Sequence, residues 1–93
     1  MNKYEILYIV DNRLSDEDKQ SVVDRINNIV TSNGGNILSE DKWGTKKFAY
    51  LINDQKEGYY VLMNFEGPAE LPEEINRQVR NMSETYRCMI LKK

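Results

Sequence analysis

The stretch YEILYIV, residues 4–10, decides the fold of this chain. Side chains alternate between the two faces of a strand, so one face carries Tyr4, Ile6, Tyr8 and Val10 and the other carries Glu5, Leu7 and Ile9. Both faces are largely apolar, which is typical of a strand that lies in the middle of a sheet. We therefore predict that residues 4–10 form a central strand, and that the rest of the chain is arranged around it.

The segment after this strand predicts a helix. Ser15 is a good N-cap residue, and Asp18 stands three residues later, in the position of a capping box. Apolar residues then recur at helical spacing: Val22, Val23, Ile26, Ile29 and Val30. Gly34 and Gly35 supply the backbone freedom that a left-handed helix end requires, so the helix should end just before them.

Two further strands follow, which we expect to pair as a hairpin. Ile37 and Leu38 open the first of them, residues 39–42 are polar, and extended structure resumes in WGTKKFAYLI, residues 43–52. A glycine inside a strand indicates a bulge or a kink, which here falls at Gly44. Residues 53–58 predict a turn, and residues 59–65 predict the third strand.

The last third of the chain predicts one more helix and one more strand. Gly67 and Pro68 interrupt the third strand, and Pro72 lies just inside the start of the helix. The buried stripe of this helix should consist of Leu71, Ile75, Val79 and Met82. Residues 85–91 predict the fourth strand.

The expected order is strand, helix, strand, strand, helix, strand. Right-handed crossovers over each helix then give an α+β fold, the ferredoxin-like βαββαβ sandwich. In this fold a four-stranded antiparallel sheet has both helices on one face. Ninety-three residues are too few for a second core, so residues 1–93 should form a single domain.

Composition narrows the function. The chain has no histidine, which is the commonest general base and metal ligand. Carboxylates and lysines can also catalyse, but this composition favours a protein that is not an enzyme, and we expect no metal site, cofactor or small-molecule substrate. No apolar run approaches the roughly 20 residues of a membrane span, so we expect no membrane partner. The single cysteine, Cys88, cannot form an internal disulfide, which favours a protein of the reducing cytoplasm. We expect Cys88 to be a small side chain of the core and not a reactive thiol.

The placement of charge points to a phosphate-rich partner, although the formal net charge is −2. Acidic residues at helix starts and basic residues at helix ends match the helix macrodipole. That rule does not explain Lys46, Lys47 and Arg87, which fall in predicted strands. Nucleic-acid binding by this chain would therefore depend on local patches of positive charge.

The segment GTKKFAYLI, residues 44–52, resembles the signature of the bacterial ribosomal small-subunit protein six family. That pattern is glycine, any residue, two mostly basic residues, a large apolar residue, a small one, tyrosine, any residue and isoleucine. Tyr4-Glu5, Gly58-Tyr59 and Arg87 also fall in register, so the resemblance covers essentially the whole chain. It implies a non-catalytic structural protein of the small ribosomal subunit. Such proteins bind the central domain of the small-subunit ribosomal RNA together with ribosomal protein eighteen of that subunit.

With this resemblance we assign two sets of candidate site residues. The residues expected to contact RNA are Lys46, Lys47, Arg87, Trp43, Lys3 and Lys92. The residues expected at the interface with the partner protein are Tyr50, Leu7, Ile9 and Met89.

Structural explanations compete with several of these assignments. Lys46 and Lys47 should point to opposite faces, and either can be a solvated lysine that keeps a strand from aggregating. Trp43 can stack on a base, pack on the partner, or cover the core of its own hairpin. Arg87 can bind phosphate or pair with an acidic residue on the sheet.

Three other functions are possible for this topology. An acyl-phosphate hydrolase needs a phosphate-cradling loop after the first strand, but residues 11–14 contain no glycine. A small-molecule-sensing dimer would use apolar residues on the open face of the sheet as its interface. An RNA recognition motif would stack bases on the central strands, but Tyr60 stands where that motif needs a small residue, and Tyr8 should face the helices.

Overall fold

The computed structural model describes the backbone of residues 2–52 and 55–93, and the side chains of residues 2–47 and 56–93. Over this part of the chain the elements follow the predicted order. Their bounds are β1 Asn2–Asp11, α1 Asp16–Ser32, β2 Asn36–Ile52, β3 Gln55–Gly67, α2 Leu71–Arg80 and β4 Thr85–Lys92.

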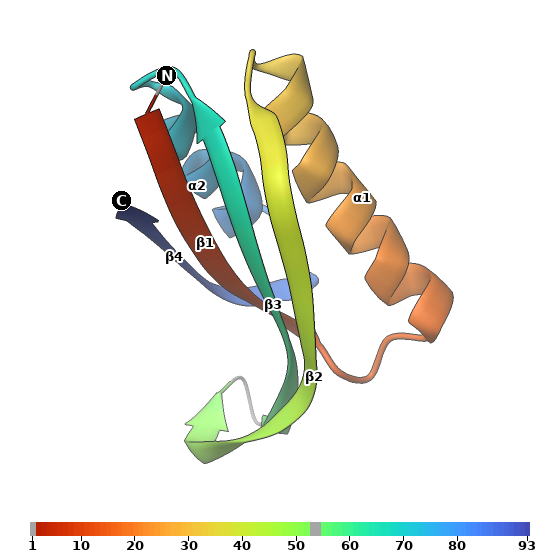
Figure 1. The fold of residues 1–93 in the computed structure, drawn as a ribbon. Helices are drawn as coiled ribbons and strands as arrows, with labels where there is room; N and C mark the ends of the chain where they lie inside the picture. Colours follow the sequence, from red (N-terminus) through yellow and green to blue (C-terminus); the bar gives the residue numbers. More distant parts are fainter. Residues whose placement is uncertain (1, 53–54) are drawn as a thin grey trace.

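The strands form one antiparallel sheet in the order β2-β3-β1-β4. Both helices lie behind this sheet, on the same face (Figure 1). The predicted ferredoxin-like sandwich is therefore confirmed. β1 pairs with β3 on one side and with β4 on the other, which confirms that it is a central strand.

The hydrophobic core lies between the sheet and the two helices. On β1 the residues that face the helices are Tyr4, Ile6, Tyr8 and Val10, and all are buried. They pack in one cluster with the alternate residues of β3 and the apolar stripes of the helices, namely Val61, Met63, Phe65, Val22, Val23, Ile26, Ile29, Val30, Leu71, Ile75 and Val79. The helix-facing side of the two central strands, β1 and β3, is thus used in folding, and the opposite face of the sheet is left open.

The ends of α1 follow the sequence signals. The Ser15 hydroxyl accepts a hydrogen bond from the backbone N–H of Asp18 at 3.2 Å, which satisfies one of the unpaired donors of the first turn. Gly34 after the helix has a φ of +85°, a value that favours glycine. A Cβ at Gly35 would lie 2.6 Å from Leu71 Cδ2 and 2.9 Å from the carbonyl oxygen of Glu66, so only glycine allows this close approach to α2 and β3.

The predicted turn at residues 53–58 is wrong for residues 55–58, because β3 already begins at Gln55. Residues 53–54 lie outside the described residues. The segment 55–58 is polar and has weak strand propensity, but it pairs with β2, as in the register of Glu57 with Lys47. Met82 also lies beyond the end of α2, although it still packs against the core.

Tyr8 gives a test of the core. Its side chain is fully buried, and its hydroxyl has no hydrogen-bond partner among the described residues. Burial raises the pKa of this tyrosine far above its usual value. Because a buried hydroxyl without a partner costs free energy, we expect Tyr8→Phe to leave the free energy of unfolding unchanged or raise it by about 1 kcal/mol. Urea denaturation measures the free energy of unfolding. A decrease of about 1 kcal/mol in the Tyr8→Phe variant would show that the Tyr8 hydroxyl is hydrogen-bonded in solution.

Candidate nucleic-acid interface

The signature segment is built around a kink in β2. Gly44 has a φ of +84°, and the pairing of β2 with β3 shifts register between Lys42 and Gly44. Trp43 is therefore an additional residue at a bulge, which is what the glycine in the sequence predicted. A bulge re-aims the side chains that follow it, and here it directs Thr45 toward the helix side and Lys46 onto the open face, where Trp43 also lies.

Trp43 forms an aromatic stack with Tyr60 of β3. The ring centroids are 6.4 Å apart and the ring planes differ by 9°, which is an offset-stacked arrangement. The Nζ atom of Lys46 lies 5.9 Å from the Trp43 ring, at cation–π distance. Trp43 nevertheless remains 43% exposed. It thus covers part of its own hairpin and still presents surface beside Lys46.

The pairing register extends this cluster across the whole sheet. Gly44 of β2 pairs with Tyr60, Tyr60 with Ile9 of β1, and Ile9 with Arg87 of β4. The exposed Arg87 therefore shares a row with the Trp43 cluster on the open face. With strands roughly 4.8 Å apart, the row from β2 to β4 spans roughly 14 Å. We call Trp43, Lys46, Tyr60 and Arg87 the kink row.

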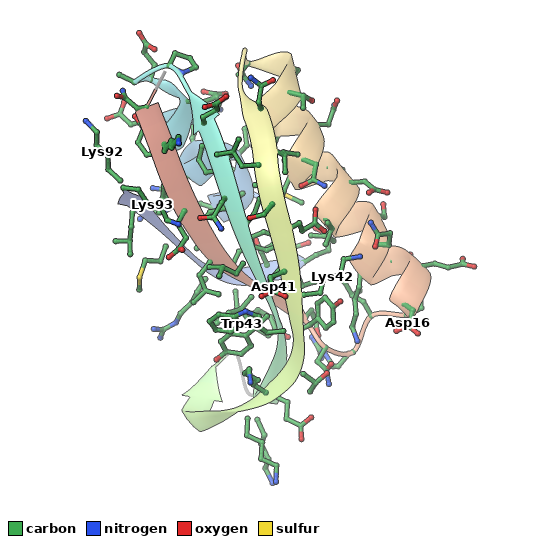
Figure 2. All side chains as sticks on the ribbon, in the orientation of Figure 1. Asp16, Asp41, Lys42, Trp43, Lys92 and Lys93 are labelled. Carbon is green, nitrogen blue, oxygen red and sulfur yellow. The ribbon has the colours of Figure 1, made fainter. Side chains whose placement is uncertain are left out.

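The other predicted RNA contacts lie elsewhere. Lys47 is exposed and follows Lys46, so the alternation of the strand directs it to the opposite side. Lys3 pairs with Glu66, whereas Lys46 pairs with Gly58, eight residues away along β3. Lys92 lies at the end of β4, remote from Trp43 in Figure 2. Of the six residues, the structure brings Trp43, Lys46 and Arg87 into one row.

The helix-facing side of β2 is occupied by polar contacts with α1 and with the loop before it. Asn27 donates to the Glu40 carboxylate at 2.9 Å, and the Lys42 ammonium donates to the side-chain oxygen of Gln20. The Thr45 hydroxyl bonds the Asn12 side chain at 2.7 Å. These contacts explain why the polar residues 39–42 continue the strand, and they hold β2 with its kink row turned away from the helices.

An apolar patch adjoins the kink row on the same face. Leu7 pairs with Leu62 of β3 and with Met89 of β4. Met89 is 59% exposed and Leu91 is 54% exposed. Ile9, also predicted at the partner interface, is only 7% exposed and offers little surface. The predicted Tyr50 lies outside the residues whose side chains are described. We call Leu7, Leu62, Met89 and Leu91 the apolar patch.

The sequence did not indicate Tyr60 as part of the candidate interface, because its pattern was considered only as a base-stacking position of an RNA recognition motif, which it does not fit. The alternation of β3 contained the signal. Val61 faces the core, so its neighbour Tyr60 must face the open side. Only the fold shows that Trp43 is the residue it meets.

The loop after β1 does not form a phosphate site. Asp11 is 8% exposed, and its carboxylate accepts hydrogen bonds from the backbone N–H of Arg13 at 2.9 Å and from the guanidinium at 3.1 and 2.9 Å. The Arg13 hydrogen bonds lower the pKa of Asp11 to about 2. The arginine that a hydrolase would need is thus engaged by this carboxylate, which argues against an acyl-phosphate hydrolase.

Other chemical sites are not found in the described part of the chain. It contains no group of three or more Cys, Asp or Glu side chains that could hold a metal ion. Burial raises the pKa of the Cys88 thiol to about 11, so this cysteine is a poor nucleophile. None of the described helices is long and apolar enough to cross a bilayer.

Comparison with known proteins decides the family. The model of the family described as ribosomal protein S6 matches residues 3–92. The chain belongs to the ribosomal protein S6 family. Members of this family are structural proteins and not enzymes.

Relatives in the ribosomal protein S6 family match along their whole length. The small ribosomal subunit protein bS6 of Desulfitobacterium hafniense is 40% identical over 93 residues, which cover 100% of this chain and 98% of that protein. The bS6 protein of Thermoanaerobacter pseudethanolicus is 38% identical over 92 residues, which cover 99% of this chain and 97% of that protein. The crystal structure of the 30S ribosomal protein S6 from Thermotoga maritima superposes with a TM-score of 0.94 at 25% identity, covering 99% of this chain and 87% of that one.

The Asp11–Arg13 pair gives a pH test. The pKa of Asp11 is lowered from 3.8 to about 2 on folding, so its stabilisation is complete above pH 4 and is lost as the pH falls through 2. We expect Asp11→Asn to cost about 1–2 kcal/mol at pH 7, because Arg13 is largely exposed and the pair is partly screened.

The difference between wild type and Asp11→Asn should shrink between pH 4 and pH 2, as followed by urea denaturation at each pH. Asp41→Asn, which removes an exposed carboxylate from β2, controls for the loss of one negative charge. A difference that stays constant down to pH 2 would contradict the lowered pKa.

Proposed function

We propose that this chain is a structural constituent of the small ribosomal subunit, and that it works in the cytoplasm on the ribosome. It would bind the central domain of the small-subunit ribosomal RNA together with ribosomal protein eighteen, without catalysis. Membership of the ribosomal protein S6 family supports the ribosomal role. The observation that carries the binding mode is the kink row, which combines positive charge and an exposed aromatic ring on the face that folding leaves open.

The kink row suits RNA for physical reasons. Lys46 and Arg87 place positive charges at the two ends of a row of roughly 14 Å, a span that covers several phosphates of a nucleic-acid strand. The exposed part of Trp43 offers an apolar ring for an unstacked base or a ribose. Because Tyr60 supports the indole from the other side, Trp43 needs little reordering when it binds.

The apolar patch suits a protein partner. Met89 and Leu91 are each more than half exposed, and they are neighbours of Leu7 and Leu62 across the sheet. Clustered exposed apolar side chains are typical of a protein interface. The patch shares the open face with the kink row, so one partner protein and one RNA segment could contact this face together. This proximity supports binding of RNA and ribosomal protein eighteen as a joint assembly.

The signature lysines provide the first test. We expect the double variant Lys46→Ala, Lys47→Ala to weaken binding to central-domain RNA in the presence of ribosomal protein eighteen. Each lysine that neutralises a phosphate contributes about 1 to the slope of log affinity against log salt, so the slope should fall by about 1–2. Filter binding at several salt concentrations measures both quantities.

Arg77→Ala is the matched control for this experiment, because Arg77 is an exposed base on α2 that pairs with Glu74. Its affinity and salt slope should equal those of the wild type. A folded double variant with unchanged affinity would remove Lys46 and Lys47 from the RNA site.

The apolar patch provides the second test. Met89→Glu places a charge at the most exposed residue of the patch, and we expect it to weaken binding of ribosomal protein eighteen at least ten-fold, by about 1.4 kcal/mol. Leu38→Glu is the matched control, because Leu38 is 49% exposed but lies on β2, the edge strand opposite to β4. Calorimetric titration measures both affinities. Equal affinities would exclude the patch as the partner interface, and a stable homodimer of the wild type in light scattering would favour a self-association surface.

A further inference from the structure

The two edges of the sheet are built differently. β2 forms one edge, and its pairing with β3 is interrupted between Ile37 and Ser39 and again at Gly44. Bulges and polar residues of this kind protect an edge against pairing with another chain. β4 forms the other edge. Its register with β1 is regular from Tyr4–Lys92 to Ile9–Arg87, and its sequence TYRCMILK contains no proline or glycine.

The backbone of β4 is oriented for pairing on its outer side. The N–H of Lys93, just after β4, donates to the carbonyl oxygen of Lys3 at 2.9 Å, so the backbone N–H of Lys93 points toward β1. Consecutive residues of an antiparallel strand direct their N–H and C=O groups alternately to the two sides. The N–H and C=O groups of Cys88, Ile90 and Lys92 are therefore directed away from β1, where the described sheet has no further strand.

A hollow runs along this outer side. One depression, of about 470 Å³, lies between β4 and α2 and is lined by residues that include Tyr4, Pro72 and Ile90. A second, of about 410 Å³, lies toward the start of β4 and reaches the open face, where Leu7 and Ile9 of β1 line it. The two depressions share Arg80, Cys88 and Met89, so they adjoin at β4 and flank it. The hollow offers mainly apolar surface for the side chains of an added strand.

The charge beside this edge is positive in a chain whose formal net charge is −2. Arg80, Arg87 and Lys92 are exposed along the two depressions, whereas Glu73 is the acidic residue that lines them. A second copy of the chain would bring a second basic edge against the first, and like charges across strands are destabilising. An acidic strand would be attracted instead.

We propose that the outer edge of β4 binds an extended acidic segment of a partner protein, which pairs with the strand as a fifth strand of the sheet. Main-chain hydrogen bonds to Cys88, Ile90 and Lys92 would provide affinity, and apolar side chains of the segment would enter the hollow. Acidic side chains would meet Arg80 and Lys92. This site goes beyond the proposed ribosomal role, because it uses the outward main-chain groups of the edge strand, although its hollow borders Arg87 of the kink row and Met89 of the apolar patch.

The test uses the full chain and a fluorescent nine-residue peptide of alternating glutamate and valine. We expect fluorescence anisotropy to show binding, and amide hydrogen exchange followed by NMR to show at least ten-fold slower exchange at Cys88, Ile90 and Lys92. A peptide of alternating lysine and valine should bind at least ten-fold more weakly. The same glutamate peptide with N-methylated valines lacks half of its donors and should also bind more weakly.

Two protein variants separate charge from folding. Lys92→Glu should weaken binding of the glutamate peptide about three- to ten-fold, whereas Lys56→Glu, an exposed position on β3, should not. The peptide comparison on the wild type stands even if a variant fails to fold. Equal binding of the glutamate and lysine peptides, or no protection of the three amides, would overturn the proposal. Equal protection of the three amides by a single-stranded oligouridine would also overturn the proposal, because the edge of β4 would then be an RNA contact.

Discussion

The alternation of side chains along β1 is the constraint on which the rest of the structure depends. β1 is paired on both sides, so the register determines the face of the sheet on which each of its side chains lies. Ile6 and Tyr8 are fully buried against the helices, whereas Leu7 lies on the other face beside Met89. A shift by one residue would exchange the two sets and expose the core. The same register therefore defines the core and the surface available for binding.

The kink at Gly44 shapes the proposed RNA site on the hairpin. A regular β2 would place Lys46 on the face opposite to Trp43, but the bulge brings Lys46 onto the open face, beside the Trp43 ring that stacks on Tyr60. The positive charge near an exposed ring thus depends on one glycine that tolerates a positive φ. Polar contacts such as Thr45 to Asn12 hold the opposite side of the strand against the rest of the fold. In this chain the segment that begins at Gly44 is thus, in physical terms, a strand that a bulge re-aims.

Local patterns predicted the elements well and their ends less well. Ser15, the apolar stripe of α1 and Gly34 gave a helix whose limits the structure confirms, because each signal acts within one or two turns. The turn predicted up to residue 58 failed because residues 55–58 gain strand structure only from pairing with β2. Propensity describes a segment alone, whereas pairing partners decide how far a hairpin extends.

By itself, the sequence determined the order of the elements, the central position of β1, the bulge at Gly44 and the resemblance to one family. These properties follow from periodicity and from the special backbone of glycine, which are local. Only the tertiary structure decided which candidate residues meet. It joined Trp43, Lys46 and Arg87 in one row, separated Lys3 and Lys92 from it, and left the edge of β4 open. Such relations depend on strand register, which no local pattern contains.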